Sequence, residues 1–142
     1  MGVLCESGPL METNRGLIVE VAFTGRFGIG AQGNSDANET MAHVTGVVKN
    51  DRPAAVLFNL SNLEYEFGDA IGAIAVPLIK TKPVTPACFV ANGTTAQALQ
   101  WFFQKDMIFG VFGFKLFSDR EQGVVFLTQR ISATQASTKV SD

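Results

Sequence analysis

The chain has 142 residues, of which 46% are hydrophobic, and 11 basic residues stand against 13 acidic ones. This length suits one domain with a single core, and the near-neutral charge argues against a nucleic acid or a membrane as partner. No apolar segment approaches the length of a membrane span. The N-terminal residues also lack the pattern of a secretory signal, so we expect a cytoplasmic protein in which Cys5 and Cys88 are free thiols.

The first part of the chain contains an N-terminal segment with two possible structures, followed by a predicted strand and a predicted helix. Residues 1–15 show little periodicity, and we predict either a flexible arm or an edge strand there. Residues 17–24 alternate apolar and mixed side chains, which is the pattern of a β-strand. A loop with several glycines follows, and then Ser35 or Asp36 can cap a helix.

An unbroken apolar run over residues 54–58 is the most informative stretch of the sequence. It is too short for a helix and is apolar on both faces, which predicts a central parallel strand. A polar turn that begins with Asn59 follows this strand. Gly68 and Asp69 then precede a helical segment as an N-cap does, and Pro77 is expected to kink or end that helix.

The C-terminal half adds further strands and helices. Residues 87–91 and 111–117 are the strand candidates, and a helix over about residues 95–106 separates them. Ser118 with Glu121 has the form of a capping box, which favours a last helix. The β-branched residues that follow leave a strand as the alternative for this last segment.

Strand and helix thus alternate four times, which is typical of an α/β domain. We predict a mixed, mostly parallel sheet of four to five strands with about four helices. The domain is expected to cover residues 16–131. The polar residues 132–142 are expected to form a disordered tail.

The stretch over residues 54–74 resembles the signature of the STAS domain, the fold of the anti-sigma factor antagonists. Residues 59–61 (Asn-Leu-Ser) are similar to the end of that family's strand, and residues 71–74 (Ile-Gly-Ala-Ile) are similar to its helix. The resemblance extends over about residues 17–127. It implies a single STAS-like domain that regulates by binding another protein, such as an anti-sigma kinase or a signalling assembly.

The residues between these two matching parts depart from the family. Gly68 stands at the position of the phosphoacceptor serine and has no hydroxyl group, while Asn59 and Phe67 are uncharged where regulated members carry acids. The resemblance therefore implies an interaction domain without the usual phosphorylation switch. Asp69 is either a permanent mimic of the phosphorylated surface or a plain N-cap.

Three consecutive aromatic residues, Trp101, Phe102 and Phe103, fall in the helix predicted over residues 95–106. Successive helix positions turn by about 100°, so these rings cannot all face the core. If Leu99, Phe102 and Phe103 face inward, Trp101 faces outward and is a candidate anchor for a protein partner or a homodimer. Shielding of Trp101 by the phenylalanine-rich segment that follows is the alternative.

The segment from Gly28 to Gly33 matches the G-x-G-x-x-G pattern of dinucleotide-binding loops, but its context does not fit that fold. The alternative function is a small-molecule module in which this loop and the helix start at Gly68 and Asp69 enclose a nucleotide or an apolar ligand. His43 is the only histidine, and no nucleophile or metal-ligand spacing accompanies it. We therefore expect no catalytic residue, cofactor or metal.

Overall fold

The structure of the protein is a computed structural model that describes residues 2–28, 31–65, 70–105 and 108–141. At residues 31–33, 70, 108 and 133–141 only the backbone is described.

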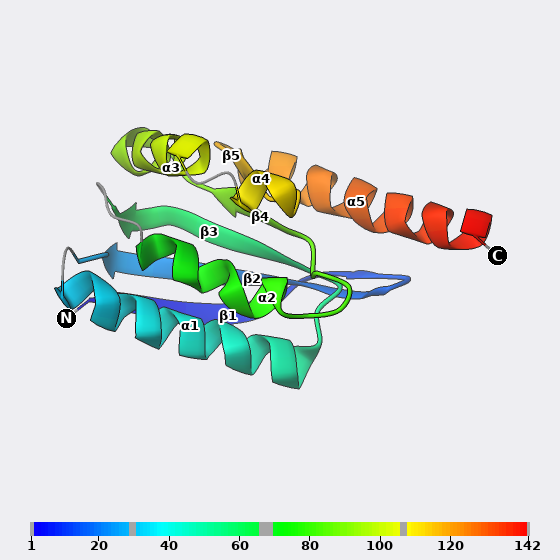
Figure 1. The fold of residues 1–142 in the computed structure, drawn as a ribbon, viewed down its shortest axis with the longest axis horizontal. Helices are drawn as coiled ribbons and strands as arrows, with labels where there is room; N and C mark the ends of the chain where they lie inside the picture. Colours follow the sequence, from blue (N-terminus) through cyan, green and yellow to red (C-terminus); the bar gives the residue numbers. More distant parts are fainter. Residues whose placement is uncertain (1, 29–30, 66–69, 106–107, 142) are drawn as a thin grey trace.

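A five-stranded sheet crosses the middle of the molecule (Figure 1). Its strands lie side by side in chain order: β1 (Val3–Thr13), β2 (Gly16–Arg26), β3 (Ala55–Glu64), β4 (Ala87–Val90) and β5 (Lys115–Phe117). β1 is antiparallel to β2, and every other neighbouring pair is parallel. The mixed, mostly parallel sheet predicted from the sequence is confirmed, and the apolar run after Ala54 forms its central strand.

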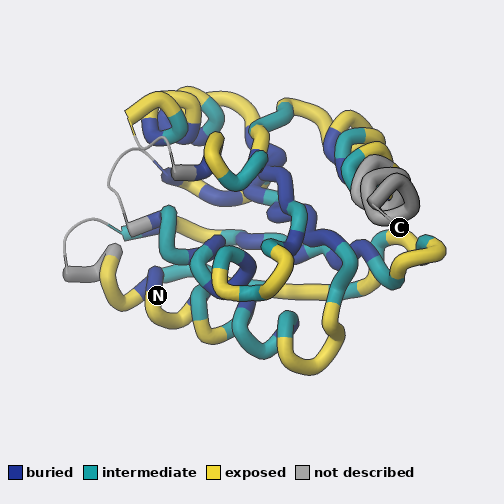
Figure 2. Tube along the Cα trace, turned by 45° about the vertical axis from the view of Figure 1, so that its right-hand side comes forward, coloured by how far each residue is buried: buried dark blue, intermediate teal, exposed yellow. Residues whose placement is uncertain are grey.

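Helices cover both faces of this sheet. They are α1 (Ala31–Asp51), the 3-10 helix η1 (Ala70–Ala75), α2 (Val76–Ile79), α3 (Gly93–Lys105), α4 (Ile108–Val111) and α5 (Arg120–Ser141). α1, η1, α2 and α3 pack on one face, where the larger core lies. α5 packs on the opposite face, over β3 and β4. Figure 2 shows that the buried residues follow the strands between these layers.

Phenylalanine rings form the centre of the larger core. Phe89 on β4 is fully buried, and its ring centroid lies 4.9 Å from Phe58, 5.4 Å from Phe109 and 5.5 Å from Phe103. Tilted, stacked and edge-on aromatic pairs at such distances stabilise a core beyond the effect of area burial alone. These contacts join the middle of the sheet to α3 and α4.

The N-terminal segment is the edge strand β1 rather than a flexible arm. β1 and β2 form a hairpin that closes at Gly16, whose φ of 125° is a conformation that only glycine adopts readily. Within the turn, the hydroxyl of Thr13 donates a hydrogen bond to the Gly16 carbonyl (2.7 Å). The sequence contained this turn signal, because Asn14 precedes Gly16 by two positions.

One local prediction around the central strand was wrong. The residues from Asn59 onward, expected to form a polar turn, belong to β3, which continues to Glu64. Their backbone groups pair with β2, and a bulge places one extra residue of β3 between Asn59 and Asn62. The helix expected after residue 69 is divided into η1 and α2, which agrees with the kink or early end expected near Pro77. Pro77 lies in the first turn of α2, where its missing N–H is not needed.

Two helix boundaries also differ from the expectation. α1 begins at Ala31, so Asp36 lies inside the helix and does not cap it. α5 continues to Ser141, beyond the end expected near Arg130. No glycine or proline follows Gly123, so no residue there interrupts the helix.

The strand predicted over residues 111–117 is only half formed. Its first part is the end of α4 and a turn at Gly113, whose φ is 78°. Only Lys115–Phe117 pair with β4. The positive φ at Gly113 turns the chain before β5 begins.

Candidate functional site

Three of the predicted site residues, Phe67, Gly68 and Asp69, lie outside the described residues, and so does part of the Gly28 to Gly33 loop. The residues on either side of the 66–69 segment are described. The hydroxyl of Thr95 on α3 donates to the carbonyl of Leu63 (2.6 Å) and accepts from the backbone N–H of Tyr65 (3.2 Å). These buried hydrogen bonds hold the end of β3 against the start of α3.

Asn59 takes part in a polar network between the sheet and α5. Its Nδ2 donates to Glu20 Oε2 (2.9 Å), and its Oδ1 accepts the backbone N–H of Ser61 (3.0 Å). Arg120, the first residue of α5, donates two further hydrogen bonds to the Glu20 carboxylate from Nε and Nη2, each 2.9 Å long. Asn59 therefore helps to position a bidentate ion pair that joins β2 to α5.

This network predicts a pH-dependent contribution to stability. The hydrogen bonds from Arg120 are the main reason that the pKa of Glu20 lies below its ordinary value of 4.5, and Asn59 adds to this effect, while burial opposes it. A carboxyl group whose pKa is lowered in the folded state stabilises the fold when the pH lies above its pKa in the unfolded state. This stabilisation is lost as the pH falls through the pKa of the folded state. Because Arg120 is half-exposed, we expect Glu20→Gln to cost only about 0.5–1 kcal/mol at pH 7.

Urea unfolding of the wild type and of Glu20→Gln at pH 7 and pH 3 measures this contribution. We expect the difference between the two proteins to shrink at pH 3. Glu6→Gln, at an exposed position of β1, is the matched control and should change stability little at either pH. A difference for Glu20→Gln that stays constant between pH 7 and pH 3 would contradict the role of the ion pair.

Trp101 lies on the outer side of α3, as the predicted helix phase requires. Leu99 and Phe102 are buried, with 0% and 1% of their surface exposed, whereas Trp101 is 51% exposed. The ammonium of Lys105 lies 4.9 Å from the centre of the indole ring, one turn further along the helix. The exposure of Trp101 is thus confirmed, while its role as a contact anchor stays a prediction.

The structure does not bring Asn59 and Trp101 together. Asn59 points to the face of the sheet that α5 covers, because it bonds Glu20 beside Arg120. Trp101 belongs to α3, whose buried residues pack on the opposite face. Of the described candidates, only Trp101 presents a large apolar surface to the solvent.

The described part of the glycine loop does not favour an anionic ligand. The backbone N–H of Gly28 donates to the carboxylate of Asp36 (2.7 Å), which is almost fully buried near the start of α1. A Cβ atom at Gly2 would collide with the same carboxylate, so the N-terminal backbone closely approaches it. A buried carboxylate at this place would repel a phosphate group.

The cysteines offer no reactive thiol. Burial raises the pKa of Cys5 to about 11, with a further contribution from the charge of Glu39, and raises the pKa of Cys88 to about 12. Both thiols are unpaired and protonated near neutral pH, and protonated thiols are poor nucleophiles. Within the described ranges, no cluster of His, Cys, Asp and Glu side chains could hold a metal ion, and no helix combines the length and apolar character that crossing a membrane requires.

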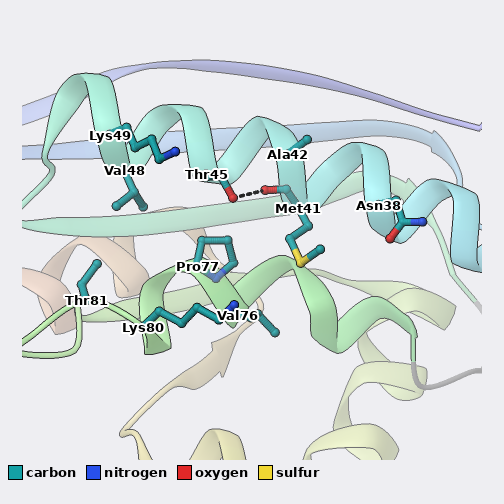
Figure 3. Close-up of a pocket in the computed structure, with 10 residues that line it drawn as sticks. All are labelled: Asn38, Met41, Ala42, Thr45, Val48, Lys49, Val76, Pro77, Lys80 and Thr81. Atoms are coloured by element: carbon teal, nitrogen blue, oxygen red, sulfur yellow. Dashed lines mark hydrogen bonds between the residues drawn. The ribbon is translucent and has the colours of Figure 1, made fainter.

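A groove between α1 and α2 is the feature that the sequence analysis missed. It has a volume of about 400 Å³ and is lined by residues of both helices and the turn that follows α2: Asn38, Met41, Ala42, Thr45, Val48, Lys49, Val76, Pro77, Lys80 and Thr81 (Figure 3). Met41, Val44, Val47 and Val48 recur at the spacing of one helix face. Val44 and Val47 are buried in the core, whereas the half-buried Met41 and Val48 line the groove, and Val48 also packs against the core.

Comparison with known proteins rests on the fold. No family model matches the sequence, and no curated protein matches it significantly. Among solved structures, the crystal structure of an anti-sigma factor antagonist from Mycobacterium paratuberculosis superposes with a TM-score of 0.60 over 87% of this chain and 95% of that chain, at 20% sequence identity. The fold is therefore STAS-like. The STAS-like fold predicted from residues 54–74 is confirmed, whereas an identity of 20% does not extend the likeness beyond the fold.

Proposed function

We propose that this chain is a non-catalytic regulatory domain of the cytoplasm that acts by binding another protein or a second copy of itself. The likeness of its fold to an anti-sigma factor antagonist supports this proposal. So does the absence of a reactive thiol and of a metal-binding cluster among the described residues. The partner would be an anti-sigma kinase-like protein or a component of a signalling assembly.

The exposed indole of Trp101 is the observation that carries the proposal. The buried side chains of Leu99 and Phe102 anchor α3 in the core, so the indole ring lies on a rigid surface. Aromatic side chains held in this way are enriched among the residues that dominate protein interfaces. Lys105 beside the ring adds a positive charge that would complement an acidic rim on the partner.

We further propose that binding is not controlled by phosphorylation at the helix start. Gly68 has no hydroxyl group that a kinase could modify. The adjacent Asp69 would instead supply a fixed negative charge at the start of the helix.

Replacement of Trp101 tests this function. We expect Trp101→Ala to weaken partner binding or self-association at least about tenfold, the effect of losing a dominant interface residue. Because the indole is half-exposed, the same change should cost about 1 kcal/mol of stability or less. Affinity would be measured by calorimetry with the partner purified after capture from a lysate, and self-association by sedimentation.

Gln122→Ala, at an exposed position of α5 on the other face of the sheet, is the control and should bind like the wild type. If Trp101→Ala binds the partner and itself with unchanged affinity, Trp101 is not the anchor and the proposed surface on α3 is wrong.

A further inference from the structure

The groove between α1 and α2 has apolar walls along most of its length. Met41 and Val48 of α1 face Val76 and Pro77 of α2 across it (Figure 3). The α1 residues from Asn38 to Lys49 line one side, and at 1.5 Å per residue this side is about 16 Å long. A volume of about 400 Å³ falls within the range of sites that hold small molecules.

The hydroxyl groups at the groove are already used inside the protein. Thr45 donates to the carbonyl of Met41 in its own helix (2.8 Å), and Thr81 donates to the carbonyl of Leu78 (2.7 Å). Thr81 also bonds Thr85 (2.8 Å). Apart from the amide of Asn38 at one end of the groove, the residues that line the groove offer a ligand mainly apolar surface.

Positive charge gathers at one end of the groove. Lys49 lies in the last turn of α1, and Lys80 directly follows the end of α2, so both ammonium groups come from the C-terminal ends of these helices. Within the described part of the chain, the ammonium group of neither lysine takes part in a hydrogen bond or an ion pair. Among the described residues, no acidic side chain lines the groove.

From these observations we infer that the groove binds a small amphiphile, namely a carboxylate with a medium-length hydrocarbon chain. The chain lies between Met41, Val48, Val76 and Pro77, where it displaces water from apolar walls. The carboxylate meets the ammonium groups of Lys49 and Lys80. This site is separate from the surface around Trp101, because it involves α1 and α2 and not α3, so its occupancy does not depend on the proposed protein contact.

Titration of the 15N-labelled protein with decanoate, kept below the concentration at which it forms micelles, tests the inference. We expect saturable chemical-shift changes at the residues of the groove. Lys49→Met combined with Lys80→Met should weaken binding about 3- to 10-fold, because each partly exposed ion pair contributes little. Decanol has the same chain without the charge and should bind the wild type more weakly by a similar factor.

Two matched variants complete the experiment. Lys82→Met removes an exposed lysine that does not line the groove and should leave decanoate binding unchanged. Ala42→Phe places a ring in the groove from an exposed position of α1 and should lower decanoate affinity at least tenfold. Absence of saturable shifts, equal binding of decanol, or wild-type affinity in Ala42→Phe or in the double lysine variant would each overturn the inference.

Discussion

Replacement of Phe89 by alanine is expected to lower the free energy of unfolding by about 3–5 kcal/mol. Phe89 is fully buried at the middle of β4, and its ring contacts those of Phe58, Phe103 and Phe109. The loss combines the transfer of a large apolar side chain with a cavity that three rings surround. Since natural domains are stable by only about 5–15 kcal/mol, the variant would lie close to the unfolding threshold.

Urea unfolding followed by circular dichroism measures this effect. Phe112→Ala is the matched control, because Phe112 is only half-buried and its nearest described ring, Phe114, lies 6.3 Å away. It should cost well under half as much as Phe89→Ala. Equal losses in the two variants would mean that the phenylalanine cluster does not centre on β4.

The second large effect is expected at Gly123, where α5 packs closely against the sheet. A Cβ atom at this position would lie 3.0 Å from Cys88 Sγ, 3.1 Å from Leu57 Cδ1 and 3.3 Å from Val90 Cγ2. A leucine would extend into these side chains and force α5 away from the sheet. We expect Gly123→Leu to cost about 1–3 kcal/mol, even though leucine favours a helix more than glycine does.

Gly46→Leu provides the control for helix propensity. Gly46 lies within α1, and a Cβ atom there would meet no atom within 4 Å. This variant should be neutral or stabilised by up to about 1 kcal/mol in the same thermal or urea unfolding experiment. A stabilised Gly123→Leu would show that α5 packs on the sheet with more space than the structure gives it.

The sequence predicted best the elements with a strong residue pattern. The short apolar run after Ala54 favoured a central strand buried on both faces, and the spacing of Leu99, Trp101 and Phe102 favoured the orientation of α3 that leaves Trp101 exposed. Boundaries were harder to predict. Asn59 looked like the start of a turn because polar residues favour turns, but the neighbouring strand β2 keeps it in the ladder.

Contacts between distant residues were beyond the sequence analysis. The bond between Asn59 and Glu20 joins residues 39 positions apart, and the ion pair with Arg120 spans 100 positions. No periodic pattern reports such partners. The groove was missed for a related reason: Met41 and Val48 have the spacing of core residues, and only the position of α2 shows that they also line a groove.

Fluorine NMR of the protein labelled with 5-fluorotryptophan tests the central proposal most directly. Trp101 is the only tryptophan, so the labelled chain gives one resonance that reports on the proposed surface. We expect this resonance to shift or broaden when the unlabelled partner is added, or with rising protein concentration if the partner is a second copy. An unchanged resonance in samples that size-exclusion chromatography shows to be complexed would contradict the proposal that this domain binds through α3.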